Sequence, residues 1–343
     1  MSVGGAQDGR SVTGQVTGDQ ADASPAEPGH EPDHSQISTS ADGRCAVGVV
    51  LYNPDLAVLC GLLEAVSPEV EEVWLFLNSV LPEGAEARLR AACRSGLRLL
   101  NDGSNPGLGI AYNRMAEAAR AAGADQLLIF DQDSSPPPGM LRQLRATHAA
   151  LRAAGERPAI VGPLAVSADD GVGFKPPRTF PSAATRAHGT AWPAEFVISS
   201  GSLLDLGACA AVGGFREDFF IDAVDIEWCF RAWAVGWSCW IESAVRMPHR
   251  LGQGTIRLPV LNMRLTRQPP SRLYTYVRNQ VAMLGLPHTP RRWKLRLLPH
   301  MAVQAAVYFA ASPGRRGIVL RAFRQGLSDG LRGRLGAGRR GGF

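Results

Sequence analysis

The chain has 343 residues, 45% of them hydrophobic, and a formal net charge of +5 at pH 7. This length can bury a large core, in one large domain or two smaller ones. The six cysteines have no CxxC spacing, which argues against zinc fingers and a disulfide scaffold and favours reduced thiols in the core. No run of residues approaches the roughly eighteen apolar residues that a bilayer-spanning helix needs.

The first 44 residues hold mostly Asp and Glu among Gly, Ser, Thr, Pro and Gln. This composition is typical of a disordered tail, and it lacks the apolar segment of a secretory signal, so we expect a cytoplasmic protein. The apolar run from Cys45 to Leu51 predicts a buried strand. Asn53 can cap the helix that follows, and Pro54 suits its first turn.

Three further strands and two helices are predicted in the first half of the chain. EVWLFLNS (72–79) and LRLLND (97–102) indicate strands, and the glycine loop of NPGLG leads into a helix that ends at Gly123. DQLLIFDQD (125–133) is the fourth strand, and the helix after three consecutive prolines ends near Gly155. Apolar strands that alternate with helices predict an α/β fold with a parallel sheet.

The second half of the chain has a different pattern. Residues 167–194 are rich in Pro, Gly and Ser, which predicts a loop. EFVISSGSLLDL predicts an extended stretch followed by a short helix, and a longer helix is predicted from about Asp222. SCWIE and VRMPH predict two short strands.

Polar residues follow the predicted parallel strands, at the edge where such sheets bind ligands. They are Tyr52, Asn53, Asn78, Asp131 and Asp133. Residues i and i+2 of an extended chain point to the same side, so Asp131 and Asp133 can face one volume unless the strand ends between them. Two carboxylates suit Mg²⁺ or Mn²⁺ completed by a substrate diphosphate. A solvated turn is the alternative explanation for the same residues.

A second group of acids lies near the start of the helix predicted from Asp222. Asp225 falls in its first turn, where the helix dipole favours the ionised carboxylate that a general base needs. Asp222 can instead cap the helix, and Glu227 can pair with Arg231 four residues later. His249 follows a predicted strand and is placed to reach the site, although a single histidine is more often structural.

Several sequence blocks, in this order, resemble the GT-A glycosyltransferases of family 2, especially bacterial rhamnosyltransferases. The blocks are VVLYNPD (49–55), NPGLGIAYNRM (105–115), FDQDSSPPPGML (130–141), SSGSLLDL (199–206), VGGFREDFFIDAVDIEWCFRA (212–232), RMPH (246–249), YTYVRNQ (274–280) and GLSDGLRGRLG (326–336). The resemblance implies a Rossmann-like, mostly parallel central sheet flanked by helices, with a C-terminal helical extension.

The resemblance also implies roles for individual residues. Asp225 stands where the family has its catalytic base, and Asp133 and His249 stand where it binds a metal, which we expect to be Mg²⁺ or Mn²⁺. The implied nucleotide-sugar pocket is formed by Tyr52, Asn53, Asn78, Asn105, Asn113, Asp131 and Arg278. The implied acceptor side is formed by Ser202, Asp222 and Trp228.

Two positions depart from the family pattern. Many relatives carry an acid after the second strand, where this chain has Asn78. Recognition of the base is therefore expected to rest on Asn78 and on backbone groups. Many relatives have Glu-Asp at the catalytic helix, where this chain has Val224 and Asp225. Asp225 is then expected to act without that neighbour, or with Asp222 one turn away.

The resemblance implies a metal-dependent inverting glycosyltransferase that transfers L-rhamnose from dTDP-rhamnose to a glycan, in cell-envelope polysaccharide biosynthesis. The alternatives are a transferase that uses another sugar nucleotide, such as a UDP-sugar, and a non-catalytic sugar-nucleotide-binding protein. A nucleotidyltransferase is disfavoured because VVLYNPD offers no phosphate site rich in Lys and Gly. A dinucleotide-binding enzyme is disfavoured because the GLG at 107–109 lacks the third glycine.

The predicted organisation has three parts. A disordered tail (1–44) precedes a glycosyltransferase domain (45–285). The nucleotide-binding half of this domain (45–166) is followed by an acceptor half (167–285). A basic, amphipathic helical region (286–343) completes the chain.

The basic region predicts one of two behaviours. From Arg291 onward it holds twelve Arg or Lys and one acid, mixed with apolar residues that include Trp293, Leu297 and Tyr308. Such helices can bind anionic lipid at the cytoplasmic face of the membrane, next to a lipid-linked glycan acceptor. They can equally pack on the body of the protein. We expect no nucleic-acid partner, because aromatic residues among the basic ones are sparse.

Overall fold

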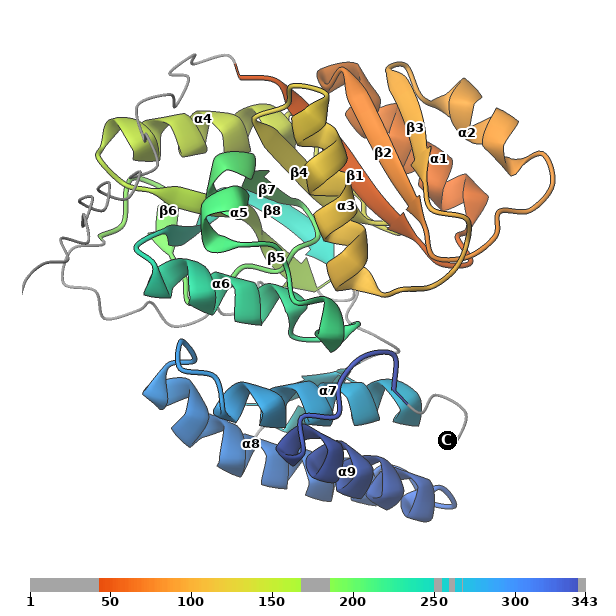
Figure 1. The fold of residues 1–343 in the computed structure, drawn as a ribbon, viewed down its shortest axis with the longest axis vertical. Helices are drawn as coiled ribbons and strands as arrows, with labels where there is room; N and C mark the ends of the chain where they lie inside the picture. Colours follow the sequence, from red (N-terminus) through yellow and green to blue (C-terminus); the bar gives the residue numbers. More distant parts are fainter. Residues whose placement is uncertain (1–42, 168–185, 250–254, 259–262, 267, 339–343) are drawn as a thin grey trace, which may run out of the picture. The chain divides into compact units, whose positions relative to one another are not determined.

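An eight-stranded sheet forms the centre of the described part of the chain (Figure 1). The computed structural model describes residues 43–167, 186–249, 255–258, 263–266 and 268–338. The predicted disordered tail therefore lies almost wholly outside the described residues, as does most of the predicted loop at 167–194. The strands are β1 (Cys45–Leu51), β2 (Glu72–Leu77), β3 (Gly96–Leu100), β4 (Gln126–Asp131), β5 (Pro158–Ser167), β6 (Ala191–Pro193), β7 (Ser202–Asp205) and β8 (Ser238–His249), with a separate pair, β9 (Thr255–Leu258) and β10 (Met263–Thr266).

Helices connect and follow these strands. They are α1 (Leu56–Val66), α2 (Ala85–Ala92), α3 (Leu108–Ala121), α4 (Met140–Ala153), α5 (Leu206–Val212), α6 (Val224–Ala234), α7 (Pro270–Leu284), α8 (Arg291–Ala310) and α9 (Arg316–Leu331), with 3₁₀ turns at Ser67–Glu69 and Glu217–Phe219. Of the helices in the described ranges, none combines the length and the apolar character that crossing a bilayer requires.

The sheet is mostly parallel, as predicted, and its strand order is β3-β2-β1-β4-β7-β5-β8-β6. Strands β1 to β4 pair in parallel with one another, and β5 pairs in parallel with β8. The predictions missed that β7 runs antiparallel to both β4 and β5. Because β1, β2 and β4 are parallel, they end at one edge of the sheet, at Leu51, Leu77 and Asp131.

The sheet is the middle of three layers, because both of its faces are apolar. Val47 and Val49 of β1 belong to a buried cluster with residues of α1, α2 and α4. Ala46 and Val50, which point to the opposite face, belong to a cluster with residues of α3, α5 and α6. The six cysteines are free thiols and five of them are buried, as expected for core residues.

The helix after β1 begins later than predicted. Its N-cap is Asp55, whose side chain accepts hydrogen bonds from the backbone N–H groups of Ala57 and Val58. Asn53 instead adopts a left-handed conformation, with a φ of 47°. The prediction of Asn53 as the cap was wrong because a capping carboxylate two residues further on competes for the same N–H groups.

Two details of the second half also differ from the predictions. Helix α6 begins at Val224, and its N-cap residue, Ala223, provides no side-chain cap, so Asp222 does not cap the helix. The two short strands predicted from SCWIE and VRMPH are one strand, β8, with a register shift opposite Pro163 and Leu164. The irregular residues between the two halves make them look separate in the sequence.

Helices α7, α8 and α9 lie alongside one another and share a small apolar cluster (Figure 1). A Cβ added at Gly326 of α9 would lie 2.8 Å from the Tyr274 carbonyl oxygen of α7, and one added at Gly330 would lie 2.5 Å from the Arg278 carbonyl oxygen. These two glycines, one helical turn apart, therefore allow the backbones of α7 and α9 to approach closely.

Part of the predicted lipid-binding surface packs inside the protein. The Trp293 ring lies edge-on to Phe196 and Phe230, with ring centroids 5.7 and 5.2 Å away. Leu297 and Tyr308 are buried. For these residues the alternative prediction holds, in which the basic helices pack on the body of the protein.

Candidate functional site

The ends of β1 and β2 are joined by short hydrogen bonds that shape the site. The Asn78 backbone N–H donates to the Leu51 carbonyl oxygen at 2.8 Å, and the Asn53 N–H donates to the Ser79 hydroxyl at 2.7 Å. The Asn78 residue is only 5% exposed, yet its Oδ1 has no hydrogen-bond partner among the described residues. A buried amide oxygen without a partner is costly, and a bound ligand that donates a hydrogen bond would satisfy it.

Gln132 attaches the end of β1 to the end of β4. Its Oε1 accepts a hydrogen bond from the Tyr52 N–H at 2.7 Å, and its Nε2 donates to the Tyr52 carbonyl oxygen at 3.0 Å. The Tyr52 side chain remains exposed. The sequence analysis missed this role of Gln132, because its partner lies eighty residues away and no local pattern indicates it.

The two acids of the FDQDSS block lie on either side of the strand end. Asp131 is the last residue of β4 and is half-buried, whereas Asp133 lies in the following turn and is exposed. The Asp131 N–H donates to the Ser200 hydroxyl, which also hydrogen-bonds the Ser134 hydroxyl at 2.7 Å. Burial and the charge of Asp133 raise the pKa of Asp131 to about 6. The carboxyl group of Asp131 therefore binds a proton more readily than a solvated aspartate does.

Asp225 lies in the first turn of α6, as predicted. Its Oδ1 accepts from the Ile226 N–H at 2.8 Å and its Oδ2 from the Ser199 N–H at 3.3 Å. Burial raises the pKa of Asp225, and the charge of Asp131 raises it slightly further. The carboxylate is thus held in a fixed orientation and is more basic than a solvated aspartate, which suits proton abstraction.

His249, at the end of β8, completes the group. Burial lowers its pKa, while the charges of Asp133 and Asp225 oppose that change. Asp131 and Asp225 bond the adjacent residues Ser200 and Ser199, which brings the end of β4 next to the start of α6. The effects of Asp133 and Asp225 on the pKa of His249 agree with a position of the end of β8 near both. The structure therefore brings together the residues for which the sequence predicted catalysis and metal binding.

Asp222 lies beside this group and is fully engaged by α7. Its Oδ1 accepts from Arg272 Nε at 3.1 Å, and its Oδ2 accepts from the Thr275 hydroxyl at 2.8 Å. Arg272 was missed by the sequence analysis. A possible signal was an arginine in the first turn of a helix that has no acid in that turn, a position that the helix dipole disfavours.

The segment before α6 has a strained backbone. Phe220, Asp222 and Ala223 have φ values of 65°, 63° and 61°. Side chains other than glycine adopt this left-handed conformation at a cost, so the surrounding structure must hold it. We call residues 219–223 the α6 entry loop.

Two neighbouring residues of α7, Arg278 and Asn279, hold the α6 entry loop in place. Asn279 Nδ2 lies 2.8 Å from the Phe219 carbonyl oxygen and 2.7 Å from that of Ile221. Arg278 is fully buried; it donates to the Phe219 carbonyl oxygen at 3.1 Å and to that of Gly336 at 2.7 Å. The guanidinium is therefore enclosed by carbonyl groups, and the structure does not place Arg278 in the nucleotide-sugar pocket.

Two of the three predicted acceptor-side residues are core residues. Ser202 is 0% exposed, and its hydroxyl donates to the Ile198 carbonyl oxygen. Trp228 is also 0% exposed, and its Nε1 donates to the Gly213 carbonyl oxygen at 2.8 Å. Neither side chain is accessible to an acceptor, because both are packed in the core.

The two remaining asparagines differ from each other. The Asn113 amide is used to hold the segment before the α6 entry loop: its Oδ1 accepts from the Phe215 N–H, and its Nδ2 donates to Glu217. Asn105 has a buried Oδ1 without a partner among the described residues, as Asn78 has. Asn105 thus stays a candidate for ligand binding, whereas the amide of Asn113 has a structural role.

The fold has known relatives among solved structures. The structure of GalNAc-T7 with UDP, GalNAc and Mn²⁺ superposes with a TM-score of 0.50 at 14% identity, over 74% of this chain and 53% of that one. This chain thus spans about half the length of that protein. S. aureus TarS 1–349 in complex with UDP-GlcNAc gives a TM-score of 0.48 at 13% identity, over 83% of this chain and 81% of that one. The predicted GT-A fold is confirmed.

Sequence comparison defines the class of enzyme. No protein-family model matches the chain. A curated relative aligns over 302 residues, 85% of this chain and 96% of its own length, at 24% identity. The chain is accordingly a glycosyltransferase of the GT-A fold, as the sequence blocks predicted. The relative is the dTDP-rhamnosyl transferase RfbF of Shigella flexneri, so the resemblance to rhamnosyltransferases is also confirmed.

Proposed function

We propose that the chain is a metal-dependent inverting glycosyltransferase that transfers L-rhamnose from dTDP-rhamnose to a hydroxyl group of a glycan. One observation carries the proposal: Asp131, Asp133, Asp225 and His249 converge at the carboxyl ends of the parallel strands. Ligands of open α/β sheets bind at this edge. The name of the Shigella flexneri relative supports the choice of donor.

The unpaired amide oxygens suit a pyrimidine base. Asn78 and Asn105 each have a buried Oδ1 with no partner among the described residues. The N3–H of thymine or uracil is a donor that could satisfy one of them. Both bases carry this group, so a UDP-sugar is the alternative donor.

The acids and His249 fit a hard divalent cation. Asp133 supplies carboxylate oxygens of the kind that such a cation prefers. Burial, followed by the charge of Asp133, raises the pKa of the neighbouring Asp131. Within the described ranges, no three His, Cys, Asp or Glu side chains form a complete metal site by themselves. Mg²⁺ and Mn²⁺ commonly use few protein ligands together with substrate phosphates. Asp133 and His249 would hold the cation, which supplies positive charge at the departing diphosphate.

The proposed reaction is a single displacement. The acceptor hydroxyl gives its proton to Asp225 while its oxygen attacks the anomeric carbon. The bond from that carbon to the diphosphate breaks, and its electron pair leaves with the diphosphate. Attack opposite to the leaving group inverts the anomeric centre. The hydrogen bonds from Ile226 and Ser199 to Asp225 fix the base in its orientation during this step.

The donor and the metal are tested by binding in one experiment. We expect dTDP-rhamnose to raise the melting temperature in the presence of Mn²⁺ and to raise it less in EDTA. Asp133→Asn should weaken the affinity for Mn²⁺ by at least about tenfold, since it removes a ligand. The control is Glu64→Gln, which makes the same acid-to-amide change on the exposed side of α1.

Other outcomes of this experiment contradict parts of the proposal. A larger shift with a UDP-sugar would replace the donor but keep the transferase. If the donor binds in this experiment and a separate assay detects no transfer to glycan or water, the non-catalytic sugar-nucleotide-binding protein is favoured instead. Equal shifts in Mn²⁺ and EDTA would remove the metal from the proposal.

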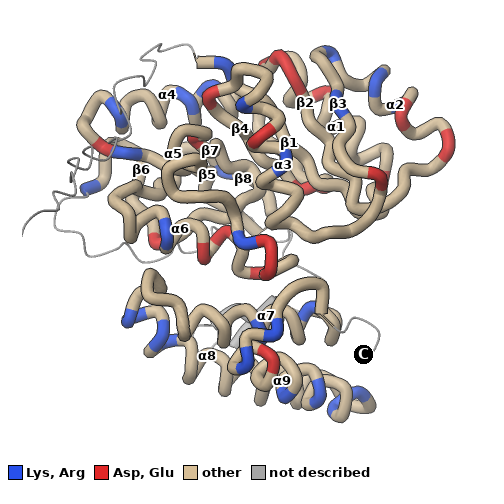
Figure 2. The backbone as a smooth tube through the Cα atoms, in the orientation of Figure 1, with Lys and Arg blue, Asp and Glu red and all other residues tan. Residues whose placement is uncertain are grey.

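The proposed acceptor is linked to a lipid, because the other side of α8 and α9 remains basic and apolar. Figure 2 shows Lys and Arg along α9 and at the start of α8. Leu295, Leu298, Leu320, Leu327 and Leu331 are exposed there, although large apolar residues usually pack inside. Basic side chains beside exposed leucines suit the headgroups and upper acyl chains of anionic lipid.

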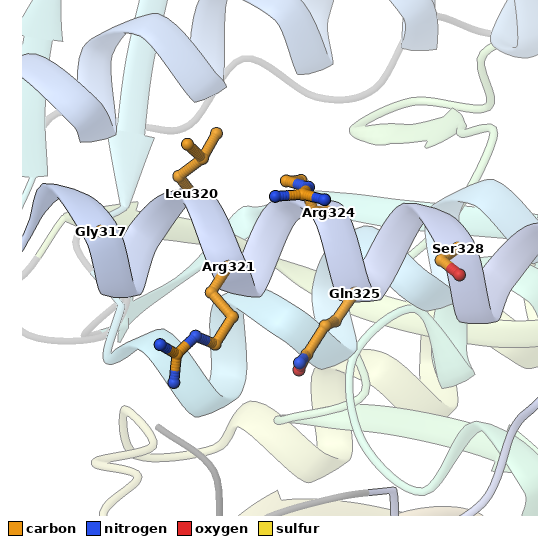
Figure 3. A pocket seen from close by; sticks show the side chains of 6 residues that line it. All are labelled: Gly317, Leu320, Arg321, Arg324, Gln325 and Ser328. Carbon is orange, nitrogen blue, oxygen red and sulfur yellow. The ribbon is translucent and has the colours of Figure 1, made fainter.

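A shallow hollow on α9 adds to this surface (Figure 3). It has a volume of about 460 Å³ and is lined by Gly317, Leu320, Arg321, Arg324, Gln325 and Ser328. In Figure 3 the Arg324 side chain leaves α9 on one side, and the Arg321 and Gln325 side chains leave it on the other. Guanidinium groups suit an anionic headgroup. None of these residues belongs to the site at the ends of the strands, so lipid and donor would bind separately.

Vesicle flotation tests the lipid partner. The full chain should float with vesicles of phosphatidylcholine and phosphatidylglycerol and remain behind with phosphatidylcholine alone. The variant L320Q/R321Q/R324Q/L327Q should bind the anionic vesicles about tenfold or more weakly, because each basic residue near such a surface contributes. The control R88Q/R142Q removes two exposed arginines from α2 and α4. Equal flotation of the variant and the control would contradict the lipid proposal.

A further inference from the structure

Arg272 is held at the site by one edge of its guanidinium. Its Nε donates to Asp222 Oδ1 at 3.1 Å, and the side chain is 44% exposed. Among the described residues, Asp222 is the only carboxylate within 4.0 Å of this guanidinium. A guanidinium has five N–H donors in a rigid fork, so the contact with Asp222 leaves its other edge available for a further anion.

The charge of Arg272 acts on the acids of the site. Burial is the largest effect on the pKa of Asp131 and of His249, and the charge of Arg272 opposes the first change and adds to the second. The contact of Arg272 with Asp222, three residues before Asp225, also places its guanidinium beside the start of α6. These residues belong to the end of β4, the end of β8 and the start of α6. Arg272 therefore lies among the residues that would surround the donor diphosphate, and its position in the first turn of α7 places a cation on that side of the site.

The contact with Asp222 does not by itself explain an arginine. Thr275 already satisfies the other oxygen of Asp222, so a lysine or a neutral donor could complete this carboxylate. The first turn of a helix disfavours a cation, and α7 has no acid there to offset it. A planar guanidinium is the group that binds two phosphate oxygens side by side.

We propose that Arg272 binds the diphosphate of the sugar-nucleotide donor through the edge of its guanidinium opposite to Asp222, and that Asp222 orients it. This inference rests on the proposed function. Positive charge at this point would also stabilise the diphosphate as it leaves. Arg272, and not Arg278, is then the arginine of α7 that contacts the donor, because the Arg278 guanidinium is enclosed by carbonyl groups.

Calorimetric titration of the full chain with dTDP and with dTMP, in Mn²⁺ and in EDTA, tests this assignment. Arg272→Gln should weaken dTDP binding by about tenfold to a hundredfold, the usual effect of losing a hydrogen-bonded charged contact. Its affinity for dTMP should change much less, because dTMP lacks the second phosphate. The dTDP affinity of Arg272→Lys should fall between those of the wild type and Arg272→Gln. One ammonium group cannot bind Asp222 and also present a second edge to the diphosphate. The control is Arg88→Gln, an exposed arginine of α2.

A purely structural role predicts a different result. Arg272→Gln and Asp222→Asn would then lower the melting temperature similarly, and the ratio of dTDP to dTMP affinity would equal that of the wild type. That result overturns the inference and leaves the proposed function intact. If Arg272→Gln does not fold, an unchanged ratio in Arg272→Lys overturns it equally. A wild-type chain that binds neither dTDP nor UDP overturns the proposed function, and this inference with it.

Discussion

Replacing Asp225 with asparagine should lower kcat by a factor of about 10³, the usual contribution of a positioned general base. Asparagine has nearly the same shape, and its Oδ1 can still accept from the Ile226 N–H. It cannot take the proton of the acceptor hydroxyl. The affinity for dTDP should stay close to that of the wild type, because Asp225 contacts the acceptor rather than the nucleotide in this mechanism.

The pH dependence of kcat gives a second readout for Asp225. Burial raises the pKa of Asp225 above the usual 3.8, and the base works only when ionised. In the wild type, kcat should therefore fall as the pH decreases through this raised pKa, and this limb should be absent in the residual activity of the asparagine variant. Glu64→Gln is the matched control. Wild-type turnover by Asp225→Asn would exclude Asp225 as the base.

Replacing Arg278 with methionine should lower the free energy of unfolding by about 3 kcal/mol. The side chain is 0% exposed, and its guanidinium bonds the carbonyl oxygens of Phe219 and Gly336 and the Asn279 Oδ1. Methionine fills a similar volume but makes none of these bonds. The α6 entry loop, which has left-handed backbone at three residues other than glycine, would lose one of the α7 side chains that hold it.

Thermal and urea unfolding measure this loss, with Arg88→Met as the control for the same substitution at an exposed position. The folded fraction of Arg278→Met should bind dTDP with nearly wild-type affinity, because the Arg278 side chain does not reach the donor. The opposite combination, normal stability with weakened dTDP binding, would return Arg278 to the pocket role that the family resemblance implied.

Asp225 and Arg278 show why the family resemblance predicted the positions of some site residues and not of others. Asp225 lies in the first turn of α6, and a motif that specifies a helix start also specifies where its first side chains point. Arg278 lies within an equally recognisable block, but its partners are 58 and 59 residues away in the chain. A matching block in the sequence identifies the residue. It does not indicate which distant group the side chain contacts in the folded protein.

The sequence by itself determined the parts that depend on local pattern. Apolar runs predicted β1 to β4, and their parallel pairing predicted the edge where Tyr52, Asn78 and Asp131 meet. The Glu227–Arg231 ion pair, predicted from spacing, has an N···O distance of 2.9 Å. Helical and extended periodicities fix such relations within a few residues, so they can be read without knowing the rest of the fold.

Only the tertiary structure decided the parts that depend on distant contacts. Ser202 and Trp228 looked like site residues and became core, because long-range packing decides which face of each element is buried. Asn113 and Arg278 hold loops. Gln132 and Arg272 take positions at the site through partners that lie 80 and 50 residues away in the chain. A polar side chain bonds whichever group folding brings within reach, and for these residues that group lies far along the chain.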